Sequence, residues 1–167
     1  ATEWYLAEGA TFWNFDLYYL IQNPTDQTAE VTITYLRPAP QTPVVQTLTV
    51  APRSRRTIHV DDIPELAAAE ISGRIVSSVP VIVERAMYLN RAEQFFAAGH
   101  ASAGVTAAAL EWYFAEGATG PYFDLFILVA NPGDTTASVE AVYLLPDGRT
   151  VTRRHTVLPY SRYNIYV

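Results

Sequence analysis

Several acidic side chains are the first residues to consider for chemistry, because paired carboxylates perform glycoside hydrolysis. Glu8 and Asp16 return 108 residues later as Glu116 and Asp124. Glu84 lies in an otherwise apolar run, where a charge must be paired or hydrogen-bonded to be tolerated. A hydrolytic carboxylate pair also needs a cleft, and nothing in the sequence requires one. We therefore expect these five acids to be structural polar residues.

The histidines offer a second kind of chemistry, because a histidine beside a serine can act as base and nucleophile. His100 lies two residues before Ser102 in a stretch rich in Gly, Ala and Ser. No Gly-x-Ser-x-Gly elbow surrounds this serine, and no acid is placed to orient the histidine. His59 and His155 lie in strand-like segments at unrelated positions. We therefore expect no catalytic residues and no enzyme activity, with a glycan hydrolase as the least favoured alternative.

Metal and cofactor chemistry has little support in the composition. The chain contains no cysteine, which excludes disulfides and cysteine–zinc sites. Asp26, Asp61 and Asp62 offer ligands for Ca²⁺ at a domain junction, but their spacing matches no calcium-binding loop. We expect no metal ion and no cofactor.

The charge and hydropathy of the chain limit its partners. The formal net charge is −6, whereas nucleic acids and anionic membrane surfaces attract basic faces. No apolar stretch approaches the roughly 18 residues that a membrane span needs. Half of the residues are hydrophobic and 13% are aromatic, so a packed core is expected. We expect neither nucleic-acid binding nor membrane insertion.

Internal similarity is the strongest signal in the sequence. Residues 3–11 recur at 111–119, and later Phe-Asp, Asn-Pro, Tyr-Leu and Ser-Arg pairs match as well. Duplication predicts a complete unit at 1–110 and the first half of a second unit at 111–167. The counterpart of residues 61–110 is missing. The half unit is then a fragment of a longer array, is completed by a neighbouring chain, or forms one pseudo-symmetric domain with the first unit.

Alternating apolar and polar residues predict strands, as in residues 29–36. Further strands are expected at 17–22, 45–50, 56–60, 71–77, 81–89, 139–145 and 150–157. Asn23-Pro24 and Asn131-Pro132 predict turns, and Pro146-Asp147-Gly148 predicts a hairpin. Residues 61–70 suggest a helical turn, and residues 96–110 a loop. The pattern indicates an all-β fold of immunoglobulin-like β-sandwiches in tandem, the second of them incomplete.

Aromatic residues near the repeated opening motif fall into two groups. Four are expected in or near the core, namely Trp4, Tyr5, Phe15 and Trp112. Four others are candidate binding residues for an exposed platform, namely Trp13, Tyr18, Tyr19 and Tyr122. Such a platform would bind surface glycans.

The combined motifs resemble a repeat found in secreted and cell-wall-associated proteins of actinobacteria and other Gram-positive or thermophilic bacteria. The matching phrases are Trp112–Thr119, Phe123-Asp124, Asn131–Gly133, Ser161-Arg162, Glu84–Tyr88 and Gly99-His100, which together extend over nearly the whole chain. The chain departs from the pattern at Ala98, where a second glycine is common. The resemblance implies an extracellular spacer or surface module and implies no particular chemistry.

We therefore expect an extracellular or cell-surface structural repeat, serving as a spacer or as a building block of filaments or surface arrays. Its partners would be adjacent repeats or copies of itself. A carbohydrate- or surface-binding adhesin module is the alternative.

Overall fold

The computed structural model describes all 167 residues and is an all-β structure with two short 3₁₀ turns. We refer to residues 1–110 as the first segment and to residues 111–167 as the second segment. Strands β1 to β8 of the first segment are Glu3–Leu6, Phe15–Asn23, Ala29–Pro38, Val44–Val50, Ser54–His59, Ser72–Ser77, Ile82–Arg91 and Gln94–Ala103. Strands β9 to β12 of the second segment are Phe126–Asn131, Ala137–Leu144, Thr150–Val157 and Ser161–Tyr166. No helix is long and apolar enough to cross a membrane.

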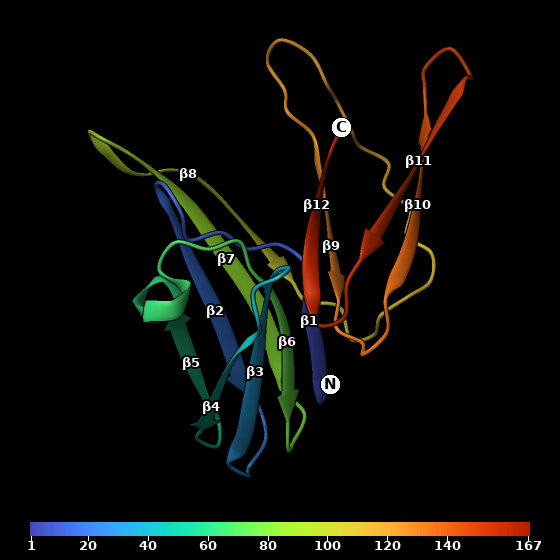
Figure 1. Cartoon of the computed structure of the whole chain (residues 1–167). Helices are drawn as coiled ribbons and strands as arrows, with labels where there is room; N and C mark the ends of the chain where they lie inside the picture. The colour runs from blue at the N-terminus through green and yellow to red at the C-terminus, as the bar shows by residue number, and fades with distance from the viewer.

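Two sheets in the first segment enclose one core, which gives a sandwich-like arrangement (Figure 1). One sheet has the order β4-β3-β6-β1 and the other the order β5-β2-β7-β8, with antiparallel neighbours throughout. Alternate residues of each strand point inward, as the period of two predicts. Tyr19 of β2 and Tyr35 of β3 stack across the core with ring centroids 5.6 Å apart.

The predicted strands are present with small shifts at their ends, but the predicted loop at 96–110 is wrong in its first half. Residues Gln94–Ala103 form β8, which pairs with β7. Most side chains of β8 are exposed, because β8 lies at the edge of its sheet. An edge strand exposed on both faces needs no apolar alternation, and its sequence therefore lacked the usual signal. The expected helical turn is present as η1 (Val60–Asp62) and η2 (Pro64–Leu66).

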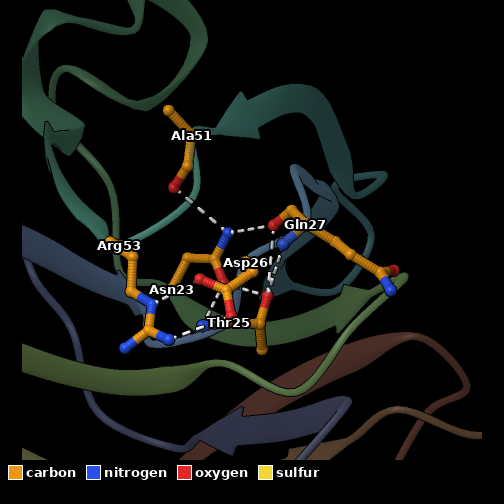
Figure 2. A network of polar contacts seen from close by, with 6 residues as sticks. All are labelled: Asn23, Thr25, Asp26, Gln27, Ala51 and Arg53. Carbon is orange, nitrogen blue, oxygen red and sulfur yellow. Dashed lines mark hydrogen bonds and ion pairs between the residues drawn. The ribbon is translucent and has the colours of Figure 1, made fainter.

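Asn23 ends β2 and ties together the loops around it (Figure 2). Its Nδ2 donates to the carbonyl oxygens of Gln27, Val50 and Ala51 at 2.7, 3.1 and 3.1 Å. Its Oδ1 accepts the backbone N–H of Thr25 at 3.0 Å. The side chain is fully buried, and this network satisfies its amide as burial requires.

Asn131 makes the same contacts in the second segment. Its Nδ2 donates to the carbonyl oxygens of Thr135, Val157 and Leu158 at 2.8, 3.1 and 3.1 Å. Its Oδ1 accepts the backbone N–H of Gly133 at 3.1 Å. The strands repeat their pairing too, because β9 pairs with β12 as β2 pairs with β5, and β10 pairs with β11 as β3 pairs with β4.

We expect Asn23→Ala to lower the free energy of unfolding of the first segment by about 3 kcal/mol, since it removes several buried hydrogen bonds and leaves carbonyl groups unpaired. Asn131→Ala should act in the same way on the second segment. Hydrogen exchange read separately in β2 and β9 measures each effect. Asp26→Asn is the control, because it breaks an exposed ion pair with Arg53 in the same turn and should leave protection unchanged. Equal effects of the three variants would contradict the account.

The second segment has no counterparts of β6 and β7, the strands that cover the edges of β3 and β2 in the first segment. In the first segment β7 pairs with the free edge of β2, and β6 with that of β3. No strand of this chain occupies the corresponding edges of β9 and β10. As a result Ile33 and Tyr35 are fully buried, whereas the corresponding Ala141 and Tyr143 are half-exposed. The inner face of β10 is therefore less covered in this structure than the corresponding face of β3.

Trp112 is exposed because the second segment has no counterpart of β6. It is 53% exposed, so its prediction as a core residue is wrong. In the first segment the corresponding Trp4 lies in β1, which pairs with β6 and packs against the core. The second segment has no counterpart of β6, and residues 111–114 form no strand.

Candidate functional site

The two segments meet where β12 joins the first sheet. Ser161 and Arg162 of β12 pair in parallel with Arg37 and Pro38 at the end of β3. The sheet of the first segment therefore continues through β12 into β9. Figure 1 shows β9 and β12 beside that sheet, with β10 and β11 farther from it. We call this contact the junction.

Arg162 is the buried cation of the junction, with a side chain that is 2% exposed. Its Nη1 donates to the carbonyl oxygen of Gly9 at 3.3 Å and lies 3.8 Å from Glu70 Oε2. Its Nη2 donates to Asn164 Oδ1, and Asn164 Nδ2 donates to Glu70 Oε1 at 2.7 Å. Burial lowers the pKa of Arg162, and the negative charge of Glu70 opposes that shift. One arginine thus links residues that are far apart in the sequence.

Gly9 has a structural reason to be glycine at this point. Its carbonyl oxygen also accepts the backbone N–H of Ile71 at 2.8 Å. A Cβ atom on Gly9 would lie 2.9 Å from the Ile71 carbonyl oxygen and 2.9 Å from the Leu17 side chain. The Glu-Gly pair of the opening motif therefore lets the chain pass close enough to η2 and β6 for Arg162 to reach it.

Arg85 is a second buried cation next to the junction, with a side chain that is 3% exposed. Its Nη2 donates to Glu8 Oε2 at 2.7 Å and to Ser102 Oγ at 3.1 Å. His100 Nδ1 lies 3.4 Å from the same nitrogen, and His100 Nε2 lies 3.4 Å from Glu8 Oε1. Glu8 is thus a structural acid that neutralises Arg85. Arg85 contacts both His100 and Ser102, and no hydrogen bond joins these two residues.

The buried charge of β7 is Arg85, which corrects the prediction that Glu84 is buried. Val81, Val83, Arg85 and Met87 alternate toward the core, and Glu84 points to solvent. Apolar residues occur on both faces of β7 near Glu84, as in the exposed Ile82 and the buried Val83. The alternation of apolar and polar residues was therefore hard to recognise in the sequence.

Three buried polar groups near the two arginines have no hydrogen-bond partner, namely Tyr19 Oη, Arg85 Nη1 and Arg162 Nε. Burial raises the pKa of Tyr19, so its hydroxyl stays protonated. A Cβ on Gly73 would lie 2.7 Å from that hydroxyl oxygen. Tyr19, Arg85 and Arg162 thus form a group of buried polar side chains next to the junction. The charges of the two arginines are balanced by Glu8 and Glu70.

The predicted aromatic platform is only partly at the surface. Trp13 is 87% exposed and Tyr122 is 90% exposed. Tyr18 is half-buried and stacks on His59 with ring centroids 4.6 Å apart. Tyr19 is fully buried, so its assignment as an exposed binding residue is wrong. Adjacent residues of a strand face opposite sides, and β2 turns Tyr19 toward the core.

The remaining predicted acids lie apart from the junction. Asp124 accepts a hydrogen bond from Tyr166 Oη at 2.8 Å, and Glu116 is exposed. Asp16 accepts a hydrogen bond from Asn90 Nδ2. Asp26 lies in the turn after the end of β2, whereas Asp61 accepts the backbone N–H of Leu17 near the start of β2, so the calcium set proposed from Asp26, Asp61 and Asp62 is not assembled.

Sequence reasoning missed a group of polar side chains formed by Asp16, His59 and Asp61, whose potential ligand atoms lie within 4.8 Å of one another. The short spacing of His59, Asp61 and Asp62 along the chain was the available signal. The position of Asp16 beside them follows from the antiparallel pairing of β2 with β5.

No family model matches the sequence, and no curated protein matches it. Among solved structures, the crystal structure of Thermotoga maritima 1070 is similar with a TM-score of 0.59 at 19% identity, over 64% of this chain and 95% of that one. This likeness concerns the fold alone. The Anabaena sensory rhodopsin transducer matches with a TM-score of 0.44 at 27% identity, over 50% of this chain and 85% of that one.

Proposed function

We propose that this protein is an extracellular or cell-surface structural module, built from immunoglobulin-like repeats and acting as a rigid spacer or array building block without catalytic activity. The observation that carries the proposal is the junction, where the buried Arg162 of one segment docks on Gly9 and Glu70 of the other. A continuous sheet with a buried, charge-balanced contact resists bending between units. Repeat proteins extend by such nearest-neighbour contacts.

The corresponding arginine of the first segment supports this reading. Arg55 follows Ser54 as Arg162 follows Ser161, but Arg55 is exposed. The two arginines share the preceding serine and the same place in a strand that pairs antiparallel with its neighbour. Arg162 docks on another segment and also contacts Asn164, which is Thr57 in the first segment. In an array, an arginine at this position would dock each unit on the one before it.

The open half of the second segment also fits an array. Its inner face and two strand edges match those that β6 and β7 cover in the first segment. Unpaired edges and open apolar faces are liabilities unless a partner covers them. The strands suited to this role have the sequence pattern of residues 61–110.

A chain extended by a second copy of residues 61–110 tests this function, because Asp61 would then follow Val167 as it follows Val60. We expect the added strands to pair with β9 and β10 and to slow hydrogen exchange in both at least tenfold. They should also abolish binding of the dye ANS to the open face.

The matched control carries aspartate at the added counterparts of Val83 and Ile75, whose originals are fully buried. This control should remain as open as the 167-residue chain. An added segment that stays unprotected, with β9 and β10 unchanged, would refute the proposal.

An adhesin module is the second candidate function, and Trp13 is the observation that favours it. Trp13 is 87% exposed and has a φ of 57°, a conformation that a bulky residue rarely adopts. Such an exposed indole suits stacking on a sugar ring. Binding of the protein to a glycan array that is lost in Trp13→Ala would support this function, and an array without hits would remove it.

A further inference from the structure

We infer that Asp16, His59 and Asp61 form a binding site for a divalent transition-metal ion, of which Zn²⁺ is the best-suited example. The residues come from β2, from the end of β5 and from η1. His59 Nε2 lies 3.4 Å from Asp61 Oδ2 and 3.6 Å from Asp16 Oδ1. Ligands about 2.0–2.2 Å from a tetrahedral zinc ion lie about 3.3–3.6 Å from one another. Both distances from His59 have this spacing.

The state of His59 Nε2 is the observation that points to a ligand. This nitrogen is buried and makes no hydrogen bond. The other ring nitrogen, Nδ1, lies 3.1 Å from Asp62 Oδ1, and because a carboxylate only accepts hydrogen bonds, Nδ1 is the donor of this contact. Nε2 itself faces the oxygens of two carboxylates. A divalent cation bound by Nε2 and by both carboxylates would satisfy the nitrogen and offset the two negative charges.

The surrounding residues hold the three side chains as metal ligands are commonly held. Asp62 orients the His59 ring through Nδ1, in the carboxylate–histidine arrangement typical of metal sites. Asn90 Nδ2 donates to Asp16 Oδ2, and the backbone N–H of Leu17 donates to Asp61 Oδ2 at 2.9 Å. Tyr18 stacks on the imidazole with an interplanar angle of 14°. Each side chain therefore has a fixed orientation before any ion arrives.

The donor set determines the class of ion. One imidazole nitrogen and two carboxylate oxygens suit zinc and its neighbours in the first transition row, whereas Ca²⁺ and Mg²⁺ prefer oxygen ligands throughout. The two carboxylates balance the charge of a divalent ion. The side chains of Asp16, His59 and Asp61 are 24, 30 and 17% exposed, so an ion has access from solvent. Three protein ligands leave further coordination positions for water or another ligand.

The second segment shows the same pair of positions without the histidine ligand. Asp124 and Tyr166 correspond to Asp16 and His59, and the tyrosine hydroxyl donates to the aspartate at 2.8 Å. A donor there satisfies the carboxylate directly, and no cation is needed. His59→Tyr is therefore the matched variant for the first segment, because it removes the ligand with a side chain that already pairs with aspartate at this position.

Titration calorimetry of the chelator-treated 167-residue protein with Zn²⁺ alone tests the site. We expect one zinc ion per chain and a higher thermal unfolding midpoint with zinc than with chelator. Ca²⁺ and Mg²⁺ should give neither effect. The Co²⁺-loaded protein should show the visible absorption of a tetrahedral ion. His59→Tyr and Asp16→Asn should abolish binding, and Asp62→Asn should weaken it about tenfold through the orientation of His59.

The other histidines provide the control for adventitious binding. His100→Gln and His155→Gln should bind zinc as the parent protein does, because neither residue lies in the three-ligand group. The inference is overturned if the parent protein binds no zinc, or if His59→Tyr binds it as tightly as the parent. It is equally overturned if His59 proves to be a stable imidazolium that keeps its proton when zinc is added.

Discussion

Arg162→Ala is expected to release the second segment from the first while the first segment stays folded. The substitution removes the contact with the Gly9 carbonyl and the ion pair with Glu70. Glu70 is 35% exposed and can be hydrated once Arg162 is gone, so the first segment retains no uncompensated buried charge. Loss of a hydrogen-bonded charge at a buried contact costs about 2–4 kcal/mol, and we expect the docking free energy to fall by that amount.

Hydrogen exchange in β12 and at the end of β3 measures this effect. Arg162→Lys should recover part of it, because lysine keeps the charge but lacks the planar fork that reaches several acceptors. Arg55→Ala is the matched control, since Arg55 has the corresponding position in the first segment and is exposed. If Arg55→Ala and Arg162→Ala had the same effect, the junction would have no special role.

Glu8→Ala is expected to destabilise the first segment more than substitution of any other partly exposed residue in contact with Arg85. It leaves Arg85, which is 3% exposed, without its counter-charge. Breaking a buried ion pair by removing one partner costs about 3–5 kcal/mol. Because Glu8 itself is 35% exposed and water can replace part of its contact, we expect a loss near 3 kcal/mol in the free energy of unfolding.

Glu116→Ala provides the control for this prediction. Glu116 is the counterpart of Glu8 in the opening motif, but it is exposed and the second segment has no counterpart of Arg85. Urea denaturation should therefore give a lower midpoint for Glu8→Ala and an unchanged one for Glu116→Ala. Equal midpoints for the two variants would show that Glu8 does not neutralise Arg85.

The strand pattern was predictable because each core strand has one buried face. Val31, Ile33 and Tyr35 alternate with polar residues, and all three are buried in β3. The same rule would have separated Tyr18 from Tyr19, since Leu17, Tyr19 and Ile21 share the inner face of β2. It would also have placed Arg85 inward with Val83. In both cases the period of two was present in the sequence, but neighbouring residues of similar type concealed it.

The junction was not predictable in this way. Ser54-Arg55 and Ser161-Arg162 are identical in sequence, yet one arginine is exposed and the other is buried. Local pattern sets the strand and the face on which a side chain lies. Whether another sheet covers that face depends on how whole segments pack, and a single sequence does not encode this in its periodicity.

The group around His59 was missed for a related reason. Asp61 and Asp62 are close to His59 in the sequence, but the third acid, Asp16, comes from a distant strand. Tyr18 pairs with His59 in the β2–β5 register, and this register brings Asp16 to within 3.6 Å of the imidazole. Long-range register of this kind follows from the assembled sheet.

The distance between the two segments tests the central claim most directly. The chain has no cysteine, so Thr47→Cys and Thr152→Cys, both at exposed strand positions, give two unique sites for spin labels. If the junction is rigid, pulsed electron paramagnetic resonance will give one narrow distance distribution, which broadens in Arg162→Ala. A distribution that is already broad in the parent protein, and is unchanged by Arg162→Ala, would contradict the account.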